Sequence, residues 1–303
     1  MTASPERVVP PGRTVSPRVV SLVPGGTEIL FALGAGATVV GVSHECDHPP
    51  AAANLPSVTT TSLSAGSTPA EIDQAVRQAV ATTTPLATLD EGLLRRLRPE
   101  VIVTQDLCPV CAVDESQLAG LAACPTVVSL AGGTLEGVFR DIQRTAEALG
   151  RPDAATELIA NLRRRLRNVS QTIAHRRRPR LVAVALEWLD PLFLGGHWVP
   201  EMFAWAGAED ALVEAGEPSR RTDWKELAAA DPDALVIMPC GFDEVSARRQ
   251  MTALIGLSEW RALRAVRQGR VYPVDANGLF SRPGPRLVDG VEHLARLLHG
   301  PPA

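Results

Sequence analysis

Short apolar runs rich in β-branched residues alternate along the chain with stretches whose apolar residues recur every three or four positions. The first pattern is typical of buried strands and the second of amphipathic helices. The predicted strands are residues 19–23, 39–42, 101–104, 126–130, 181–186, 234–238 and 271–274. The predicted helices are residues 27–33, 68–82, 91–97, 114–122, 135–149, 198–206, 224–229 and 286–298. This alternation predicts an α/β fold with mainly parallel strands.

A longer pattern separates two such halves. From residue 152 to residue 175, apolar residues such as Leu162, Leu166 and Val169 keep the helical spacing, with arginines between them. One continuous amphipathic helix is therefore predicted, with Pro152 in its first turn. We expect a disordered segment at 1–17, a Rossmann-like lobe at 18–150, the connecting helix at 151–178, and a second Rossmann-like lobe at 179–303. A helix of this kind is a stiff connector, unlike a Gly/Ser linker.

The composition changes this picture little. The 303 residues are 45% hydrophobic and 21% charged, with a net charge of −4, so neither nucleic acid nor an anionic membrane is an expected partner. The sequence has no apolar run long enough to span a membrane. Residues 1–17 lack the apolar core of a secretory signal, and the first cysteine is Cys46. We therefore predict a cytoplasmic protein, whose thiols stay reduced.

Four of the five cysteines follow the carboxyl ends of predicted strands: Cys46, Cys108, Cys111 and Cys240. Ligands of open α/β sheets bind outside the carboxyl ends of the strands, so these cysteines would line one cleft if the two lobes face each other. Cys124 precedes its strand and is expected at the opposite edge. The CxxC pair is able to hold a metal ion or to act as a redox dithiol. For Cys46 alone, a buried structural thiol is the alternative.

The segment HECDHPP, residues 44–50, adds polar side chains beside Cys46. His44, Glu45, Asp47 and His48 are possible ligands of a metal or small molecule. The same residues are also good turn formers without any metal.

The segment LEWLDP, residues 186–191, supplies Glu187 and Asp190 beyond another predicted strand. Trp188 and Trp198 would offer a flat apolar wall to a large planar ligand, with a place in the core as the alternative. His197 precedes a predicted helix, where a capping or packing role is equally open.

The glycines of LVPGGTEILFALGAG, residues 22–36, match neither the Walker pattern nor GxGxxG. They predict a tight strand-to-helix turn capped by Thr27, with Gly34 ending the helix.

Four segments carry a family resemblance: RVVSLVPGGTEILFALGAGATVVGVSHECDHPP, GGHWVPEMFAWAGAEDAL, WKELAAADPDALVI and VYPVDANGLFSRPGPRLVDGVEHLARLL. Together they resemble the helical-backbone (class III) substrate-binding proteins of metal-chelate ABC transporters, most of all the cobalamin-binding branch. The resemblance spans about residues 18–298. It implies two α/β lobes joined by the long helix, with a cobalamin, siderophore, haem or metal bound between them. A possible partner is an ABC transporter, although the chain shows no export signal.

The resemblance also implies which residues lie at the cleft. It places there Pro24, Gly25, Gly26, Trp188, Trp198 and the loop 277–282, which includes Asn277 and Arg282. Glu45 and Asp190, at strand ends, are further candidate ligand contacts.

Two functions of different classes follow. The first is a cytoplasmic binding protein for cobalamin or a related corrinoid. The alternative is an enzyme of the same fold whose iron–sulfur cluster or transition metal is held by Cys46, Cys108, Cys111 and Cys240, with Glu187 or His197 as the acid–base group. A zinc-stabilised interaction module is a third possibility.

Overall fold

A computed structural model describes residues 16–64, 67–82, 84–106, 113, 118, 125–175 and 179–300. The predicted disordered segment, except its last two residues, lies outside the described part, as does most of the predicted helix at 114–122. Cys108, Cys111 and Cys124 lie outside it too.

The first lobe is built on a parallel sheet with strand order β2-β1-β5-β6. Its strands are β1 (Val19–Ser21), β2 (Val39–Val42), β5 (Val101–Gln105) and β6 (Thr126–Leu130). Its helices include α1 (Pro24–Ala32), α3 (Glu91–Leu97) and α5 (Leu135–Ala148), with 3-10 turns η1 (Gly36–Thr38) and η2 (Ala52–Asn54). Two short strands, β3 (Thr59–Thr61) and β4 (Ala87–Leu89), pair antiparallel in a separate ribbon with α2 (Pro69–Thr82) between them.

The second lobe has a mixed sheet in the order β10-β8-β7-β11-β12, with β9 also paired to β7. Its strands are β7 (Leu181–Leu189), β8 (Leu192–Leu194), β9 (Ala208–Asp210), β10 (Arg220–Arg221), β11 (Ala234–Ile237) and β12 (Val271–Pro273). Its helices are α7 (Val199–Trp205), α8 (Trp224–Ala230), α9 (Glu244–Met251), η3 (Thr252–Leu254), α10 (Ser258–Ala262), α11 (Arg264–Arg267), α12 (Ala276–Leu279) and α13 (Leu287–His299). Strands β9, β11 and β12 run parallel to their neighbours, and β8 and β10 run antiparallel.

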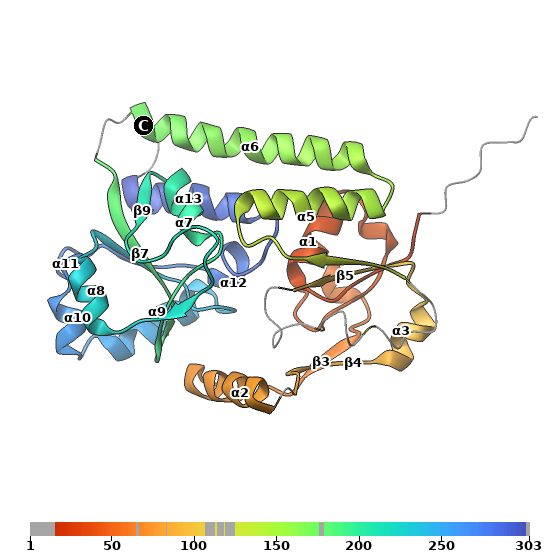
Figure 1. The fold of residues 1–303 in the computed structure, drawn as a ribbon, viewed down its shortest axis with the longest axis horizontal. Coiled ribbons are helices and arrows are strands. Elements are labelled where there is room, and N and C mark those ends of the chain that lie inside the picture. The colour runs from red at the N-terminus through yellow and green to blue at the C-terminus, as the bar shows by residue number, and fades with distance from the viewer. Residues whose placement is uncertain are drawn as a thin grey trace, which may run out of the picture.

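The long helix predicted between the lobes is confirmed as α6 (Pro152–His175). It extends along one side of both lobes (Figure 1). Leu162 and Leu166 are buried in the core that it shares with α5 and α13. Arg165 donates to Asp289 and Glu292 of α13, so ion pairs add to the apolar packing. The predicted lobe boundaries at residues 150 and 179 stay a prediction.

The two-lobed α/β fold is confirmed, and two local predictions are wrong. Strand β7 does not stop at residue 186, because Trp188 pairs with Phe193 of β8, so Glu187 and Trp188 lie within the strand. Thr27 does not cap α1, because the helix begins at Pro24 and Thr27 lies inside it. Proline suits a first helical position, which has no intrahelical bond to lose. Gly34, with φ of 70°, follows the end of this helix as predicted.

Within the described ranges, no helix is both long and apolar enough to cross a membrane.

Candidate functional site

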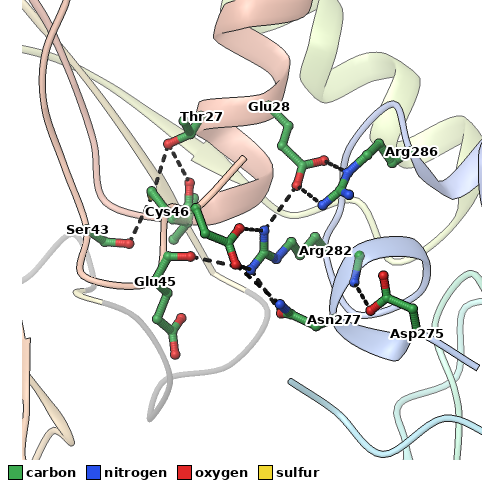
Figure 2. Close-up of polar contacts among 12 residues, drawn as sticks. Thr27, Glu28, Ser43, Glu45, Cys46, Asp275, Asn277, Arg282 and Arg286 are labelled. Carbon is green, nitrogen blue, oxygen red and sulfur yellow. Dashed lines mark hydrogen bonds and ion pairs between the residues drawn. The ribbon is translucent and has the colours of Figure 1, made fainter. Parts of the chain in front are cut away.

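Charged side chains from both lobes meet at the lobe boundary in what we call the Arg282 network (Figure 2). It comprises Glu28, Asp47, Asn277, Arg282 and Arg286. Glu28 lies in α1 beyond β1, Asp47 follows β2, and Asn277 lies in α12 beyond β12. The network therefore forms at the carboxyl ends of strands, where the sequence predicted a site.

Arg282 is the centre of this network and is only 8% exposed. Its guanidinium donates to the two Asp47 oxygens at 2.5 and 3.1 Å, and to Glu28 at 3.3 Å. It also donates to the Asn277 side chain at 2.9 Å and to the Glu45 carbonyl at 3.3 Å. Arg282 thus joins the lobes, because its carboxylate partners belong to the first lobe and the arginine to the second.

A second arginine completes the neutralisation of Glu28, whose side chain is 3% exposed. Arg286 donates to both of its oxygens, at 2.8 and 3.0 Å. Two arginines therefore face two carboxylates, the buried Glu28 and the more exposed Asp47, so the charges of the network balance. A buried charge without such partners would be strongly destabilising.

The ion pair between Asp47 and Arg282 shifts the pKa of both groups. Burial alone would raise the pKa of Asp47, but the hydrogen bond and charge of Arg282 outweigh it and lower the pKa. Burial opposes protonation of Arg282, and the carboxylates of Asp47 and Glu28 raise its pKa nonetheless. Both groups are therefore charged at neutral pH.

The backbone also makes close contact across the boundary. A Cβ on Gly25 would lie 2.7 Å from the carbonyl oxygen of Pro283, a distance that real side chains do not adopt. Gly284 faces back toward Glu28 and Gly25. Gly25, placed at the cleft by the family resemblance, therefore lies against the second lobe. Gly26 packs inside the first lobe against Val103, and Pro24 is half-buried.

Cys46 has the surroundings of a core thiol. It is 5% exposed, and its sulfur lies 3.0 Å from the hydroxyl of Thr27 and 3.1 Å from that of Ser43. Burial raises the pKa of the thiol, although both hydroxyls work against the rise. The sulfur thus contacts two hydroxyls and no other candidate ligand among the described residues, so the structure does not support Cys46 as part of the predicted metal set.

Nothing in the described residues supports the rest of that set. Cys240 is exposed at the end of β11, and Cys108 and Cys111 lie outside the described part. No three histidine, cysteine, aspartate or glutamate side chains gather into a metal-binding group in the part of the chain that is described. The exposed His44 places its ring 2.8 Å from the Thr59 hydroxyl, and Glu45 is also exposed.

The two tryptophans that were predicted to form an apolar wall for a planar ligand differ in their burial. Trp198 is 5% exposed and donates its indole N–H to the Phe280 carbonyl at 2.7 Å, so the core role left open for it holds. Trp188 is only half-buried and packs against Phe242, with ring centroids 5.9 Å apart. The Phe242 carbonyl accepts the backbone N–H of Asn277 at 3.0 Å. Trp188 is thus connected through Phe242 to the Arg282 network.

A second contact between the lobes surrounds His197, which has φ of 55°. Its imidazole faces Gly133 beyond β6, and Gly216 approaches Thr134 from the second lobe. Burial lowers the pKa of His197, so its imidazole is neutral at pH 7. In the same region Glu201 of α7 accepts the Leu135 N–H of α5 at 2.5 Å.

The two acidic residues of LEWLDP have different surroundings. Glu187 accepts a short hydrogen bond from the Ser219 hydroxyl, whereas Asp190 is exposed in the turn between β7 and β8.

Two cavities lie away from this boundary. One of about 440 Å³ lies beside α5, and one of about 220 Å³ lies between α6 and α13. Neither is lined by residues of both lobes.

Sequence reasoning did not single out Glu28 and Arg286 as site residues. A signal existed for the first, because Glu28 is the only charged residue of the apolar helix α1. A buried charge of this kind demands a partner. Nothing in the sequence identified which arginine that partner would be.

Two α/β lobes spanned by one long helix, with the boundary built from strand ends, define a class III substrate-binding protein. The chain belongs to the periplasmic binding protein family, which matches residues 19–277.

Individual relatives are distant but cover nearly the whole chain. The uncharacterized ABC transporter substrate-binding lipoprotein YvrC of Bacillus subtilis (strain 168) is 24% identical over 286 residues, 93% of this chain and 80% of that protein. The vitamin B12-binding protein of Vibrio cholerae serotype O1 is 23% identical over 286 residues, 93% of this chain and 88% of its own. The solved structure of the periplasmic heme-binding protein BhuT in complex with two hemes is similar with a TM-score of 0.69 at 26% identity, covering 93% of this chain and 98% of that one.

Proposed function

We propose that the protein binds a planar metal chelate between its two lobes, with a corrinoid such as cobalamin as the first candidate. Membership of the periplasmic binding protein family supports a binding function. One relative is named a vitamin B12-binding protein and a similar solved structure is a heme-binding protein, and both ligands are flat macrocycles around a metal.

The observation that carries the proposal is the position of Trp188. This half-buried tryptophan packs on Phe242 and lies at the end of a chain of contacts that leads to the Arg282 network. Its indole N–H has no hydrogen-bond partner among the described residues. A buried indole N–H normally has an acceptor. The amide side chains of a corrinoid would supply one while the ring face covers the indole.

A haem-type ligand is the second candidate, and His197 favours it. Haem iron takes an axial ligand from the protein, and a neutral imidazole is a common one. His197 is half-buried at the lobe boundary and neutral at pH 7 because burial lowers its pKa.

Titration of the purified protein with cyanocobalamin and with hemin tests both candidates. For a corrinoid, Trp188→Ala is expected to weaken binding about tenfold or more, since truncating a buried aromatic anchor costs about 2 kcal/mol. Trp188→Phe keeps the aromatic surface without the N–H and is expected to lose less. Trp224→Ala is the control, because Trp224 packs on Trp260 in the other core of the second lobe.

The outcomes separate the candidates. Cobalamin affinity that is equal in wild type and Trp188→Ala would contradict the proposed wall. Binding of hemin with an absorbance band that His197→Ala abolishes would favour haem. Absence of binding to either compound would overturn the proposal.

The enzyme alternative lacks support, since Cys46 does not fit a cluster ligand and Glu187 is engaged by Ser219. We do not propose it further.

An ABC transporter is the proposed recipient of the chelate, as the family relationship suggests. Such delivery requires the protein to meet its transporter outside the cytoplasm. The sequence-based prediction of a cytoplasmic location is therefore incompatible with delivery to a transporter. That location stays a prediction. Fractionation of cells that express the natural gene decides between them: a cytoplasmic protein would contradict delivery to an importer.

A further inference from the structure

Helix α2 departs from the body of the first lobe. It lies between β3 and β4, whose antiparallel ribbon is separate from the four-stranded sheet. In Figure 1 this ribbon leads to α2 at the bottom of the view, beneath the second lobe and on the opposite side from α6. The first lobe therefore extends a helix toward its neighbour.

Packing contributes little to the stability of this helix. Of the residues of α2, only Ala79 is buried, and Val80 is 62% exposed. A capping box provides local stability instead: Glu71 accepts the Thr68 N–H at 2.7 Å, and Thr68 accepts the Glu71 N–H at 3.3 Å. Such reciprocal capping stabilises a helix start without tertiary contacts. Helix α2 is thus suited to move as a unit.

One ion pair ties α2 to the second lobe. Asp73, whose side chain is 10% exposed, lies 3.4 Å from Arg221 of β10 and 2.8 Å from Arg77 of its own helix. The Arg221 guanidinium lies over the Phe193 ring, 5.4 Å from its centroid. The ring of β8 therefore holds Arg221 in position for a partner that comes from the other lobe.

Packing and ion pairs hold the rest of the lobe boundary together. Helix α6 packs along both lobes, and Arg282 joins them through a buried ion pair with Glu28 and a more exposed one with Asp47. Large lobe opening would have to break these contacts together, which makes it a costly route for a ligand. An element with few contacts on the side opposite α6 is a better candidate for controlling entry.

We propose that α2 is a lid over the inter-lobe ligand site, held on the second lobe by the Asp73–Arg221 pair. Release of this pair lets α2 swing on the β3–β4 ribbon while the lobes keep their arrangement. The lid rests on the proposed function, because it controls access to the chelate site. The latch itself is a property of the protein without ligand.

Amide hydrogen exchange of the ligand-free protein tests the latch. Arg221→Gln and Asp73→Asn are each expected to raise exchange in residues 69–82 about two- to fivefold, the range for loss of an exposed ion pair. The double variant should match Asp73→Asn alone, since that change already removes the pair with Arg221, together with the pair that Asp73 forms with Arg77 inside α2. Arg95→Gln is the matched control: Arg95 is 58% exposed against 51% for Arg221, and its pair with Glu91 stays within α3. Exchange in α2 that is unchanged in Arg221→Gln would overturn the latch.

Stopped-flow mixing with cyanocobalamin and hemin tests the lid. Arg221→Gln is expected to speed both association and dissociation by similar factors of about two to five, so that the affinity changes less than either rate. Unchanged rates in a variant that still binds the chelate would overturn the lid. If neither chelate binds to wild type, the proposed function fails and the lid with it, whereas the exchange experiment still decides whether the latch exists.

Discussion

The guanidinium of Arg282, from the second lobe, lies 2.5 Å from the carboxylate of Asp47, from the first. The same guanidinium reaches Glu28, which is almost fully buried. One side chain thereby couples two strand ends that are separated by more than 230 residues in sequence. Removing the Arg282 side chain should therefore destabilise the protein more than removing any single surface contact.

Replacing Arg282 by Met is therefore expected to lower the free energy of unfolding by about 3 kcal/mol, because a buried carboxylate loses a partner. Arg163→Met is the control. Arg163 pairs with Glu136 on the surface, with both side chains about half-exposed, and should cost less than about 1 kcal/mol. Urea unfolding of the three proteins measures both values. Equal losses in the two variants would show that the Arg282 network does not join the lobes in solution.

Gly25→Ala is expected to destabilise the protein although alanine favours helices. Helix propensity alone would gain about 1 kcal/mol, but the new methyl group would meet the Pro283 carbonyl. The expected net loss is about 1–3 kcal/mol, as for overpacking in a core. Gly256→Ala is the control, since nothing lies within 4 Å of its Cβ position. A gain in melting temperature for Gly25→Ala would contradict the close contact between the lobes.

Asp210→Asn is expected to stabilise the protein at neutral pH. Burial raises the pKa of Asp210 from 3.8 to about 6, although the N–H groups of Leu212 and Val213 oppose the rise. Its folded-state pKa lies above its unfolded value, so the folded state holds the proton more tightly. Its contribution is thus most favourable below pH 4 and is lost as the pH rises through 6.

Asparagine keeps the Oδ1 acceptor that both N–H groups use, and it carries no charge. The gain of Asp210→Asn over wild type should therefore grow between pH 4 and pH 7, by about 2 kcal/mol. Urea unfolding at several pH values measures it. Asp243→Asn is the control of opposite sign: the Ser246 hydrogen bonds lower the pKa of Asp243, so removing its charge should not stabilise. A gain for Asp210→Asn that is independent of pH would contradict the assignment.

Cys46→Ala separates the core role of this thiol from a metal-binding role. We expect a loss of about 1–2 kcal/mol in unfolding free energy from the lost packing and hydrogen bonds, with chelate affinity unchanged. Metal content after anaerobic purification should equal that of wild type. The exposed Cys240 provides the comparison, and Cys240→Ala should cost less. Loss of a bound metal in Cys46→Ala would restore the metal-ligand role.

The sequence by itself determined the elements with strong local patterns. The strand at residues 39–42, the helix at 91–97 and the long helix α6 have the predicted bounds, because their periodicity and end signals lie within a few residues of each other. The sequence also indicated that functional residues gather at strand ends, since parallel α/β sheets place them there. The short strands β8, β9 and β10 escaped prediction, because their pairing partners rather than their own composition make them strands.

Tertiary structure alone decided what each strand-end residue contacts. Trp188 and Trp198 have similar local sequence signals, yet the first is half-buried against Phe242 and the second fills the core. Cys46 follows a strand as a ligand would, but Thr27 and Ser43 surround its sulfur. Arg282 and Glu28 form a pair across 254 positions of sequence, and no local pattern encodes such a partner. The energy of a buried charge depends on what surrounds it in space, and that arrangement exists only once both lobes have folded and packed together.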